Sequence, residues 1–347
     1  MPRTKTVTEA EPVNLSVEAA LALCTRAAVG AGASQVVAAS LAQSGVAAEA
    51  AGQPSVGLAH FVDYLDAIHA GRINGRATPD ITRPAIAVFL SDARRGAAHP
   101  GFDMAFEDMT RSARLFGVAI FSQKNAYTCG ALGYFAGRLA EAGLVAIAAT
   151  NGPPLLAGSG GKKPVFCTNP LAFAAPVADG PPLIIDQASS STAFVNIRKA
   201  AKAGEKIPEG WAVDARGKPT TDAKAAAKGA LLAFGGERGA NIALMVEVLA
   251  AGLSGANWSL DAPSFTTGSQ SPGTGLFVIA MSPALFDPAF EDRMKAQLHR
   301  LGAQYGVYIP GKGKADSVIK SRETGLTVPR DVYDRLMAEA DKAEAEA

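Results

Sequence analysis

From about residue 84 onward, short apolar runs alternate with segments of helical spacing, and this alternation restricts the fold more than any other feature of the chain. The apolar runs stand at 85–90, 117–121, 144–150, 171–177, 182–186 and 275–281. Segments with helical spacing lie between them, for example at about 100–114 and 130–142. Strands that alternate with helices pair into a sheet, and the helices cover its faces. The sequence therefore predicts an α/β core.

The residues before this alternation have helical spacing alone. Asn14 or Ser16 can cap a first helix, and a second helix is expected after Ser34. Apolar residues within 57–70 recur at helical spacing, and the pattern stops at Gly71, as at a helix C-terminus. We expect a flexible tail at 1–13, a helical part at 14–80 that packs with the C-terminal helices, a cofactor- and substrate-binding core at 81–320, and a C-terminal helix with an acidic tail at 321–347.

Charge and cysteine usage restrict the class of partner. Because 33 Lys and Arg balance 32 Asp and Glu, no global field attracts nucleic acid or an anionic membrane. Residues 1–14 contain acidic side chains and no apolar stretch, so we expect no signal peptide, and no later run reaches the roughly 20 apolar residues of a membrane-spanning helix. The three cysteines form no CxxC pair, which argues against a disulfide framework or a zinc site. These features predict a cytoplasmic protein with a small-molecule partner.

The common nucleotide and metal motifs do not occur. No G-x-G-x-x-G follows a predicted strand, so a Rossmann crevice is not expected. The stretch 157–164 approaches a phosphate-binding loop, but Lys163 and Pro164 stand where that loop needs a Ser or Thr to hold magnesium. The four histidines have no metal-ligand spacing, so no metal is expected.

Polar clusters instead follow several predicted strands. They are TNGPP at 150–154, CTNP at 167–170, DQASSS at 186–191 and FGGERG at 234–239. Ligand contacts in α/β proteins usually lie at strand ends. One such cluster alone is better explained by local structure, since Thr168 and Asn169 can close a turn ahead of a proline and Asp186 can cap a helix. The series of four favours a ligand site.

The order of these clusters resembles that of the malate/L-lactate dehydrogenase family, which also contains sulfolactate dehydrogenases and cyclic imino acid reductases. The similarity covers roughly residues 15–335. CTNPLAFAAP resembles the family's G-T-N-P block, LIIDQASS its D-x-A-T-S block, and LLAFGGERGANIALMVEVLAAGLSG its G-G-x-K-G helix. The last block, with SPGTGLFVIAM, is most similar to the imino acid reductase branch. The resemblance implies a non-Rossmann fold with an N-terminal helical part and a mixed-sheet core, a homodimer, and NADH or NADPH as cofactor.

Carried over position by position, the resemblance implies a set of cofactor contacts and substrate contacts. The implied cofactor contacts are Thr128, Cys129, Gly130, Ala131, Leu132, Asp186, Gln187, Ala188, Glu237, Arg238, Pro310, Gly311, Lys312 and Lys314. Thr168 is expected to meet the substrate. Arg238 either contacts a phosphate or begins a solvated helix, and Lys312 and Lys314 either pair with a 2′-phosphate or are solvated loop lysines.

Two departures from the family pattern fall near the end of the N-terminal helical part. The family carries Ser-His-Gly there, with the histidine as proton donor, and an arginine four residues later that holds the substrate carboxylate. Here Ser55 is followed by Val56, and His60 occupies the arginine position. His60 can hold a carboxylate when protonated, deliver a proton, or simply pack as a core residue.

Two further departures concern the core. The position of a second family histidine falls on Thr128, and that of a lysine common in malate-type members falls on Asn196. We therefore expect His60, Asp186 and Thr128 as catalytic residues. We expect Ser55, His60, Thr168 and Asn196 as substrate-binding residues.

These departures favour an imine as substrate. Reduction of a ketone needs a general acid, typically worth about 10² to 10⁴ in rate, whereas a cyclic imine is more basic and can arrive protonated. The sequence thus predicts an NAD(P)H-dependent reductase that converts Δ1-pyrroline-2-carboxylate or Δ1-piperideine-2-carboxylate to L-proline or L-pipecolate. Two other interpretations stay open: a malate- or lactate-type dehydrogenase acting on 2-oxo and 2-hydroxy acids, and a catalytically silent nucleotide-binding or scaffold protein.

Overall fold

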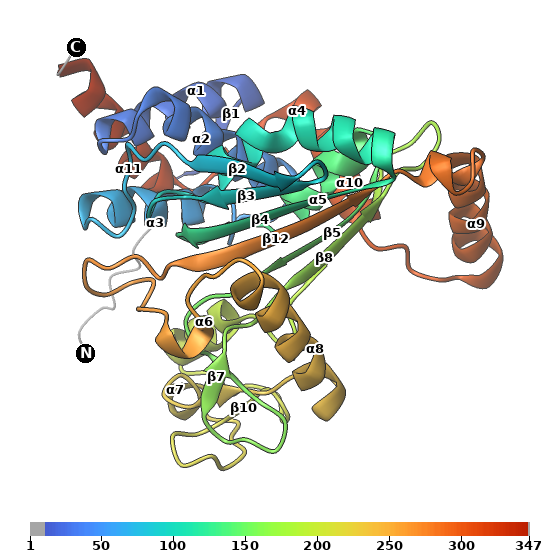
Figure 1. Cartoon of the computed structure of the whole chain (residues 1–347). Helices are drawn as coiled ribbons and strands as arrows, with labels where there is room; N and C mark the ends of the chain where they lie inside the picture. The colour runs from blue at the N-terminus through green and yellow to red at the C-terminus, as the bar shows by residue number, and fades with distance from the viewer. Residues whose placement is uncertain (1–10, 346–347) are drawn as a thin grey trace, which may run out of the picture.

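A mixed sheet of seven strands lies at the centre of the computed structural model, which describes residues 11–345 (Figure 1). In spatial order the strands are β2 (Asp80–Ala85), β3 (Val88–Asp92), β4 (Val118–Ala126), β12 (Thr274–Met281), β5 (Val145–Thr150), β8 (Leu171–Ala175) and β9 (Leu183–Gln187). β3 and β4 pair in parallel, and every other neighbouring pair is antiparallel. The expected α/β fold with a mixed-sheet core is confirmed.

Helices cover both faces of this sheet. On one face lie α4 (His99–Phe116) and α5 (Gly133–Glu141), and their buried Phe102 and Phe135 pack with Phe121 of β4. On the other face, α8 (Glu237–Glu247) and the π-helical turn Val248–Gly252 pack against apolar residues of β5, β8 and β12. The sheet is therefore buried on both sides, which explains why its strands appear in the sequence as continuous apolar runs.

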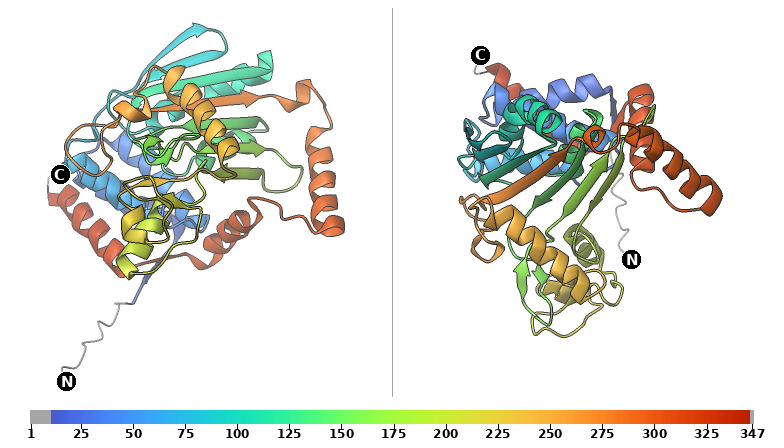
Figure 2. Two further views of the ribbon diagram at one scale, coloured as in Figure 1. Left: turned by 90° about the horizontal axis from the view of Figure 1, so that it is seen from below. Right: turned by 45° about the vertical axis from the view of Figure 1, so that its right-hand side comes forward.

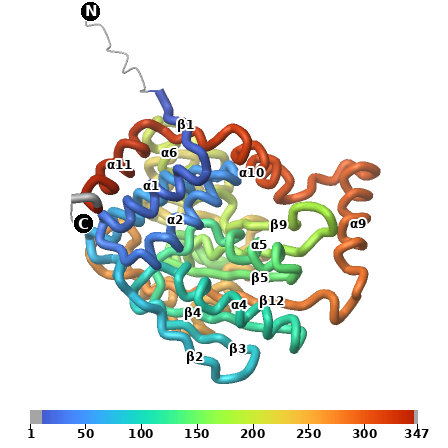
Figure 3. Tube along the Cα trace, turned by 90° about the horizontal axis from the view of Figure 1, so that it is seen from above, coloured from blue at the N-terminus to red at the C-terminus, as the bar shows by residue number. Residues whose placement is uncertain are grey.

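A separate helical layer contains the N-terminal helices α1 (Val17–Gly30), α2 (Gln35–Ala50) and α3 (Leu58–His69) together with α11 (Arg330–Ala345) from the opposite end of the chain. Figure 3 shows α11 running beside α1. The strands β1 (Val13–Leu15) and β13 (Leu326–Val328) pair antiparallel beside this layer. Ser16 and Ser34 cap α1 and α2 by accepting hydrogen bonds from Ala19 N and Val37 N, as their positions predicted.

The ends of the chain differ in part from the expected tails. Of the tail expected at 1–13, residues 1–10 lie outside the described residues, whereas Val13 belongs to β1. The apolar run at 85–90, expected as one strand, is divided between β2 and β3 by a turn at Ile86 and Ala87. β2 forms the edge of the sheet, where Pro84 is tolerated because an edge strand can lack one ladder donor.

A small lobe lies below the main sheet in Figure 1. It contains a four-stranded sheet and two helices: β6 (Leu156–Ala157), β7 (Pro164–Phe166), β10 (Ala212–Val213), β11 (Ala230–Leu231), α6 (Phe194–Ala203) and α7 (Ala223–Ala226). The glycine and proline content of the stretch 152–164 predicts a loop, but the stretch contributes β6 and the start of β7. Strands of two or three residues are too short to produce a periodic signal in the sequence.

After β12 the chain forms two helices on the outside of the molecule. α9 (Phe290–Tyr305) projects away from the body, and α10 (Lys312–Thr324) returns along it (Figures 1 and 2). Neither helix contains a fully buried residue. Among the helices that the structure describes, none is long and apolar enough to cross a membrane.

The contact between α1 and α11 leaves no room for a side chain at Gly30. A Cβ atom there would lie 1.9 Å from the Glu339 carbonyl oxygen on α11. Because the obstructing atom belongs to the backbone, we expect Gly30→Ala to force the helices apart and lower the free energy of unfolding by about 2 kcal/mol. Urea denaturation measures this change. Gly302→Ala on α9, where the nearest atoms lie at an ordinary 3.7 Å, is the matched control and should not destabilise; equal stability of both variants would contradict the prediction.

Candidate active site

The turn between β4 and α5, residues 127–132, meets α3 at a cluster of polar side chains. The His60 Nε2 atom lies 3.4 Å from Thr128 Oγ1, although the two residues are 68 positions apart in the chain. The other ring nitrogen of His60, Nδ1, lies 3.0 Å from an Asp63 carboxylate oxygen. The tertiary structure thus brings together two of the three residues that the sequence proposed as catalytic.

Helical periodicity explains why α3 presents this cluster. Asp63 and Tyr64 follow His60 by three and four positions, so all three side chains share one face of the helix. Phe61 and Leu65 are fully buried and anchor α3 in the helical layer. The rings of His60 and Tyr64 pack edge to face with centroids 4.6 Å apart, and the His60 side chain keeps 21% of its surface exposed.

Hydrogen bonds from two elements fix the backbone of this turn. The Tyr64 hydroxyl donates to the Thr128 carbonyl at 3.4 Å, and His99 Nε2 of α4 lies 3.1 Å from the Cys129 carbonyl. Gly130 has a φ of +62°, and a Cβ atom there would approach the Tyr64 hydroxyl to 3.1 Å. Burial raises the pKa of the Cys129 thiol to about 12, so this cysteine is neutral and suited to backbone contact rather than to nucleophilic chemistry.

Asp186, the third proposed catalytic residue, stands at the other end of the same turn. Its carboxylate accepts a hydrogen bond of 2.8 Å from the Gly133 backbone N–H and thereby caps α5. Burial raises the pKa of Asp186, and the positive charge of Lys314 acts in the opposite direction. The sequence predicted that Asp186 could cap a helix. It does so, but the helix is α5, which lies 53 positions away in the chain.

The expected cofactor segment 310–314 lies against the edge strand that carries Asp186. Gly311 has a φ of +85°, and a Cβ atom there would lie 2.9 Å from the Ile184 carbonyl oxygen of β9. Lys312 pairs with Asp316 at 2.8 Å, whereas Lys314 acts electrostatically on Asp186. Of the two alternatives for Lys312 and Lys314, that of loop lysines is wrong, because α10 begins at Lys312 and both residues lie in its first turn.

The segment with Glu237 and Arg238 begins α8. Gly235 and Gly236 precede it with φ values of +58° and +64°, and both charged side chains are exposed. The Phe234 N–H donates to the Ser189 carbonyl at 3.0 Å, which places this glycine turn beside the chain that leaves β9 after Gln187 and Ala188. All the segments expected to hold the cofactor are thus connected to one another through β9 and its continuation.

A buried network holds the expected substrate residue Thr168. Its carbonyl accepts from the Ser189 N–H at 2.8 Å, and the next residue, Asn169, is completely buried. The Asn169 side-chain amide donates to Glu247 of α8 at 2.7 Å, and Glu247 also accepts from the backbone and hydroxyl of Ser259. This network ties the T-N-P turn to α8.

Two of the expected substrate residues lie apart from this cluster. Ser55 is exposed, and Asn196 belongs to α6 of the lobe, where its amide donates to Thr192 Oγ1 at 3.1 Å. Within residues 11–345, no hydrogen bond joins either of them to His60 or Thr128. Their roles stay predictions.

Sequence reasoning missed Asp63, Tyr64, His99 and Glu247. The three-residue spacing from His60 was a usable signal for Asp63, since side chains at that distance share a helix face. No comparable signal marked His99 or Glu247, because each acts on a segment distant in sequence.

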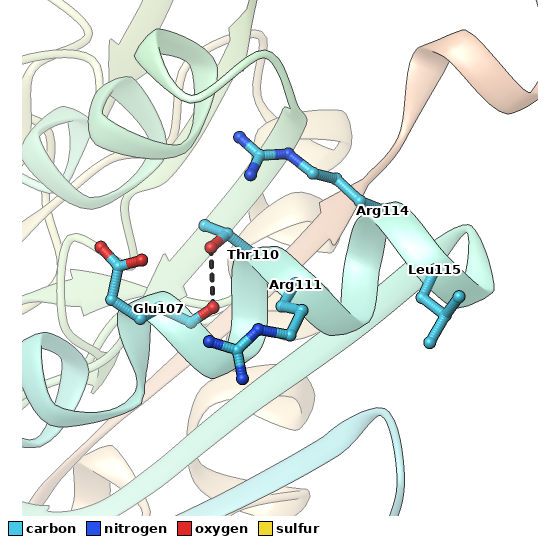
Figure 4. A pocket seen from close by; sticks show the side chains of 5 residues that line it. All are labelled: Glu107, Thr110, Arg111, Arg114 and Leu115. Carbon is cyan, nitrogen blue, oxygen red and sulfur yellow. Dashed lines mark hydrogen bonds between the residues drawn. The ribbon is translucent and has the colours of Figure 1, made fainter.

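A shallow depression on the outer surface of α4 does not belong to this site (Figure 4). It has a volume of about 380 Å³, and Glu107, Thr110, Arg111, Arg114 and Leu115 line it. The Thr110 hydroxyl donates back to the Glu107 carbonyl at 2.9 Å, within the same helix. None of the residues that the sequence proposed lines it.

Residues 15–337 match the family described as malate/L-lactate dehydrogenase. The chain is 37% identical to a (2R)-3-sulfolactate dehydrogenase (NADP(+)) of Chromohalobacter salexigens over 84% of its own length and 88% of the relative. It is 35% identical to a Δ1-pyrroline-2-carboxylate/Δ1-piperideine-2-carboxylate reductase of Pseudomonas putida over 86% of its length and 88% of that enzyme.

Solved structures give the same result for the fold. The Δ1-piperideine-2-carboxylate reductase of Pseudomonas syringae superimposes with a TM-score of 0.90 at 32% identity, covering 94% of this chain and 99% of that one. The sulfolactate dehydrogenase of Methanocaldococcus jannaschii gives a TM-score of 0.86 at 27% identity, covering 96% and 98%. The fold expected from the resemblance is confirmed.

The buried His99 that supports the turn makes stability depend on pH. Burial lowers its pKa from 6.5 to about 4, because a charged ring would lose its hydration in the protein interior. The ring therefore stays neutral in the folded state at pH values above about 4. The unfolded chain therefore takes up a proton as the pH falls from 6.5 toward 4 while the folded chain does not, so stability is lost across this window and His99 has no effect above it. Between pH 7 and pH 5 this loss amounts to about 2 kcal/mol.

We expect His99→Gln to remove this share of the pH dependence, because the amide does not titrate. The measurement is the free energy of unfolding in urea at pH 7 and pH 5 for both proteins. His299→Gln on the exposed face of α9 is the matched control and should keep the wild-type difference. An unchanged pH dependence in His99→Gln would show that His99 does not titrate as described.

Proposed function

This chain belongs to the malate/L-lactate dehydrogenase family and is an NAD(P)-dependent oxidoreductase, and we propose that it reduces a small cyclic α-imino acid. The substrate class is Δ1-pyrroline-2-carboxylate or Δ1-piperideine-2-carboxylate, and the products are L-proline or L-pipecolate. The names of the reductase relatives support this class. The named sulfolactate dehydrogenase relative supports the second candidate, a dehydrogenase of open-chain 2-hydroxy acids.

The observation that carries the proposal is the chemistry of the side chains that meet at the β4–α5 turn. The contact between α3 and the turn is made by His60 and the Thr128 hydroxyl, and the residue before Gly57 is the apolar Val56. The histidine that serves as proton donor in the family is absent at Val56, and Thr128, in place of the second family histidine, offers a hydroxyl, which by itself is a weak acid for protonating an alkoxide. A cyclic imine is more basic than a ketone, so a weak donor is enough to protonate it.

Charge at the site supports the same choice. His60 stands where the family's arginine holds the substrate carboxylate, and Asn196 stands where malate-type members carry a lysine, so the site offers less fixed positive charge to a dicarboxylate and repels an iminium less. Asp186, when ionised, would stabilise that iminium. The Thr168 hydroxyl is suited to receive the single carboxylate of the imino acid.

Three glycine-containing turns fit a bound dinucleotide. Gly130, Gly236 and Gly311 all have positive φ values and precede the helices α5, α8 and α10. Among the described residues, no side chain caps α8 or α10. The Lys312 N–H of α10 donates to the Ile309 carbonyl, so an anion would bind to other N–H groups of the first turns, with Arg238 and Lys314 close in sequence. When bound, NADH or NADPH would supply the hydride; the residues named here would hold and orient it.

We propose that the enzyme is a cytoplasmic homodimer. α9 and its neighbours expose large apolar side chains, including Phe286 at 78%, Tyr308 at 77% and Tyr305 at 63%. A second copy of this chain, as the family resemblance implies, would cover this surface. The cytoplasmic location is supported by the three cysteines, which are free and buried.

A substitution at Arg238 tests the cofactor contacts. We expect Arg238→Ala to weaken NAD(P)H binding by roughly 10- to 100-fold, the usual loss for one charge-assisted hydrogen bond, with little effect on stability. Calorimetric titration with NADH and NADPH measures the binding. The control is Arg111→Ala, an exposed arginine on α4 that pairs with Asp108. If neither dinucleotide binds below millimolar concentration to the unmodified protein, the proposed cofactor site is wrong.

The substrate class is tested by one spectrophotometric panel. NADH and NADPH consumption are followed with the two cyclic imino acids and with pyruvate, oxaloacetate, 2-oxoglutarate and 3-sulfopyruvate. We expect kcat/KM for one of the cyclic imines to exceed that of every oxo acid by about tenfold or more, since loss of a strong general acid costs an oxo acid at least that factor. Faster turnover of any open-chain oxo acid than of both imines would reject the proposal in favour of the dehydrogenase.

A further inference from the structure

We propose that Asp63, His60 and Thr128 form a proton relay, in which the Thr128 hydroxyl protonates the substrate nitrogen, His60 resupplies the hydroxyl, and Asp63 positions His60. The inference rests on the proposed reduction of a cyclic imine and names the proton donor for it. Thr128 is the catalytic residue that touches the substrate, and Asp63 is a positioning residue.

The partners of the imidazole define where its protons lie. Nδ1 is 3.0 Å from the Asp63 carboxylate, which accepts hydrogen bonds only, so Nδ1 carries a proton in both charge states. Nε2 is 3.4 Å from Thr128 Oγ1. In the neutral ring Nε2 accepts from the hydroxyl, and in the charged ring it donates to the hydroxyl oxygen. Protonation of His60 therefore turns the Thr128 hydrogen away from the ring and frees it for a substrate atom.

The surroundings keep this arrangement in place. The Tyr64 ring packs 4.6 Å from the His60 ring, and its hydroxyl holds the Thr128 carbonyl. His99 faces the same cluster from α4 and holds the Cys129 carbonyl, and burial keeps it uncharged at neutral pH by lowering its pKa to about 4. Asp63 is thus the charged side chain bonded to His60, while Tyr64 and Thr128 are its neutral neighbours.

The relay accounts for every proton and electron pair in the reduction of the imine. The lone pair of the imine nitrogen takes the Thr128 hydroxyl proton while Thr128 Oγ1 takes the Nε2 proton from the charged His60 ring. The bound dinucleotide would supply the hydride to the imine carbon, and the π electron pair of the C=N bond would become the nitrogen lone pair of the cyclic amine. His60 is left neutral with its remaining proton on Nδ1 beside Asp63. Its 21% exposed side chain can then take a proton from solvent.

The decisive comparison uses variants at Thr128. Thr128→Val keeps the shape and removes the hydroxyl, so we expect kcat to fall about 100-fold with KM changed less than about threefold. Thr128→Ser keeps the hydroxyl and should lose no more than about threefold. Each variant is assayed with the best substrate of the panel. Its affinity for NADH and NADPH, measured by calorimetry, and its urea midpoint show whether cofactor binding and folding are intact.

The role of Asp63 is tested on the same helix. We expect Asp63→Asn to lower kcat roughly tenfold, whereas Asp66→Asn, which removes a carboxylate paired with Arg335, leaves kcat unchanged. His60→Ala should lose about 100-fold and regain activity with added imidazole. A readout independent of turnover is nitrogen NMR of the His60 ring without cofactor or substrate: the neutral ring should carry its proton on Nδ1, and Asp63→Asn should weaken that preference.

Near wild-type kcat in Thr128→Val, or a neutral His60 ring protonated on Nε2, would overturn the relay. A panel in which an oxo acid is the best substrate would reject the proposed function instead. The relay would then be judged by the same variants on that oxo acid and by the NMR measurement, so the two failures are distinguishable.

Discussion

The site depends on one short turn, residues 127–132, and side chains from three parts of the molecule bind the backbone of this turn and of the first residue of α5. Tyr64 of the helical layer binds the Thr128 carbonyl, His99 of α4 binds the Cys129 carbonyl, and Asp186 of the edge strand binds the Gly133 N–H. Each bond comes from a different layer of the molecule. The position of this turn therefore depends on how the helical layer, α4 and the main sheet pack against one another.

Asp186 caps α5, and two opposing effects act on the pKa of its carboxylate. Capping α5 places the carboxylate at the positive end of a helix, which favours its charged form, while burial raises its pKa and favours the neutral form. Because these two effects oppose each other, a further charge close to Asp186 would shift its pKa. Lys314 on α10 is one such charge, and a substrate cation would be another.

The helical layer depends on close packing between the two ends of the chain. α1 and α11 come from opposite ends of the chain and pack so closely that Gly30 meets the backbone at Glu339. The layer is therefore complete only when α1 and α11 have both packed. The layer in turn holds α3, which carries His60, Asp63 and Tyr64. Stability of the layer and geometry of the proposed relay are linked through α3.

The sequence by itself determined most of the regular structure, because apolar periodicity and capping residues are local signals. Ser16, Ser34 and Gly71 marked helix ends that the structure contains, and the apolar runs marked the buried strands of the main sheet. Periodicity could not locate the two-residue strands of the lobe, the division of the run at 85–90 or the beginning of α10 at Lys312. For the site, motif order selected His60, Thr128 and Asp186 as candidates. Only the tertiary structure decided that His60 and Thr128 lie within hydrogen-bonding distance, that Asp186 caps α5, and that His99 supports the turn, since each of these contacts joins residues 30 or more positions apart and no local pattern encodes such a distance.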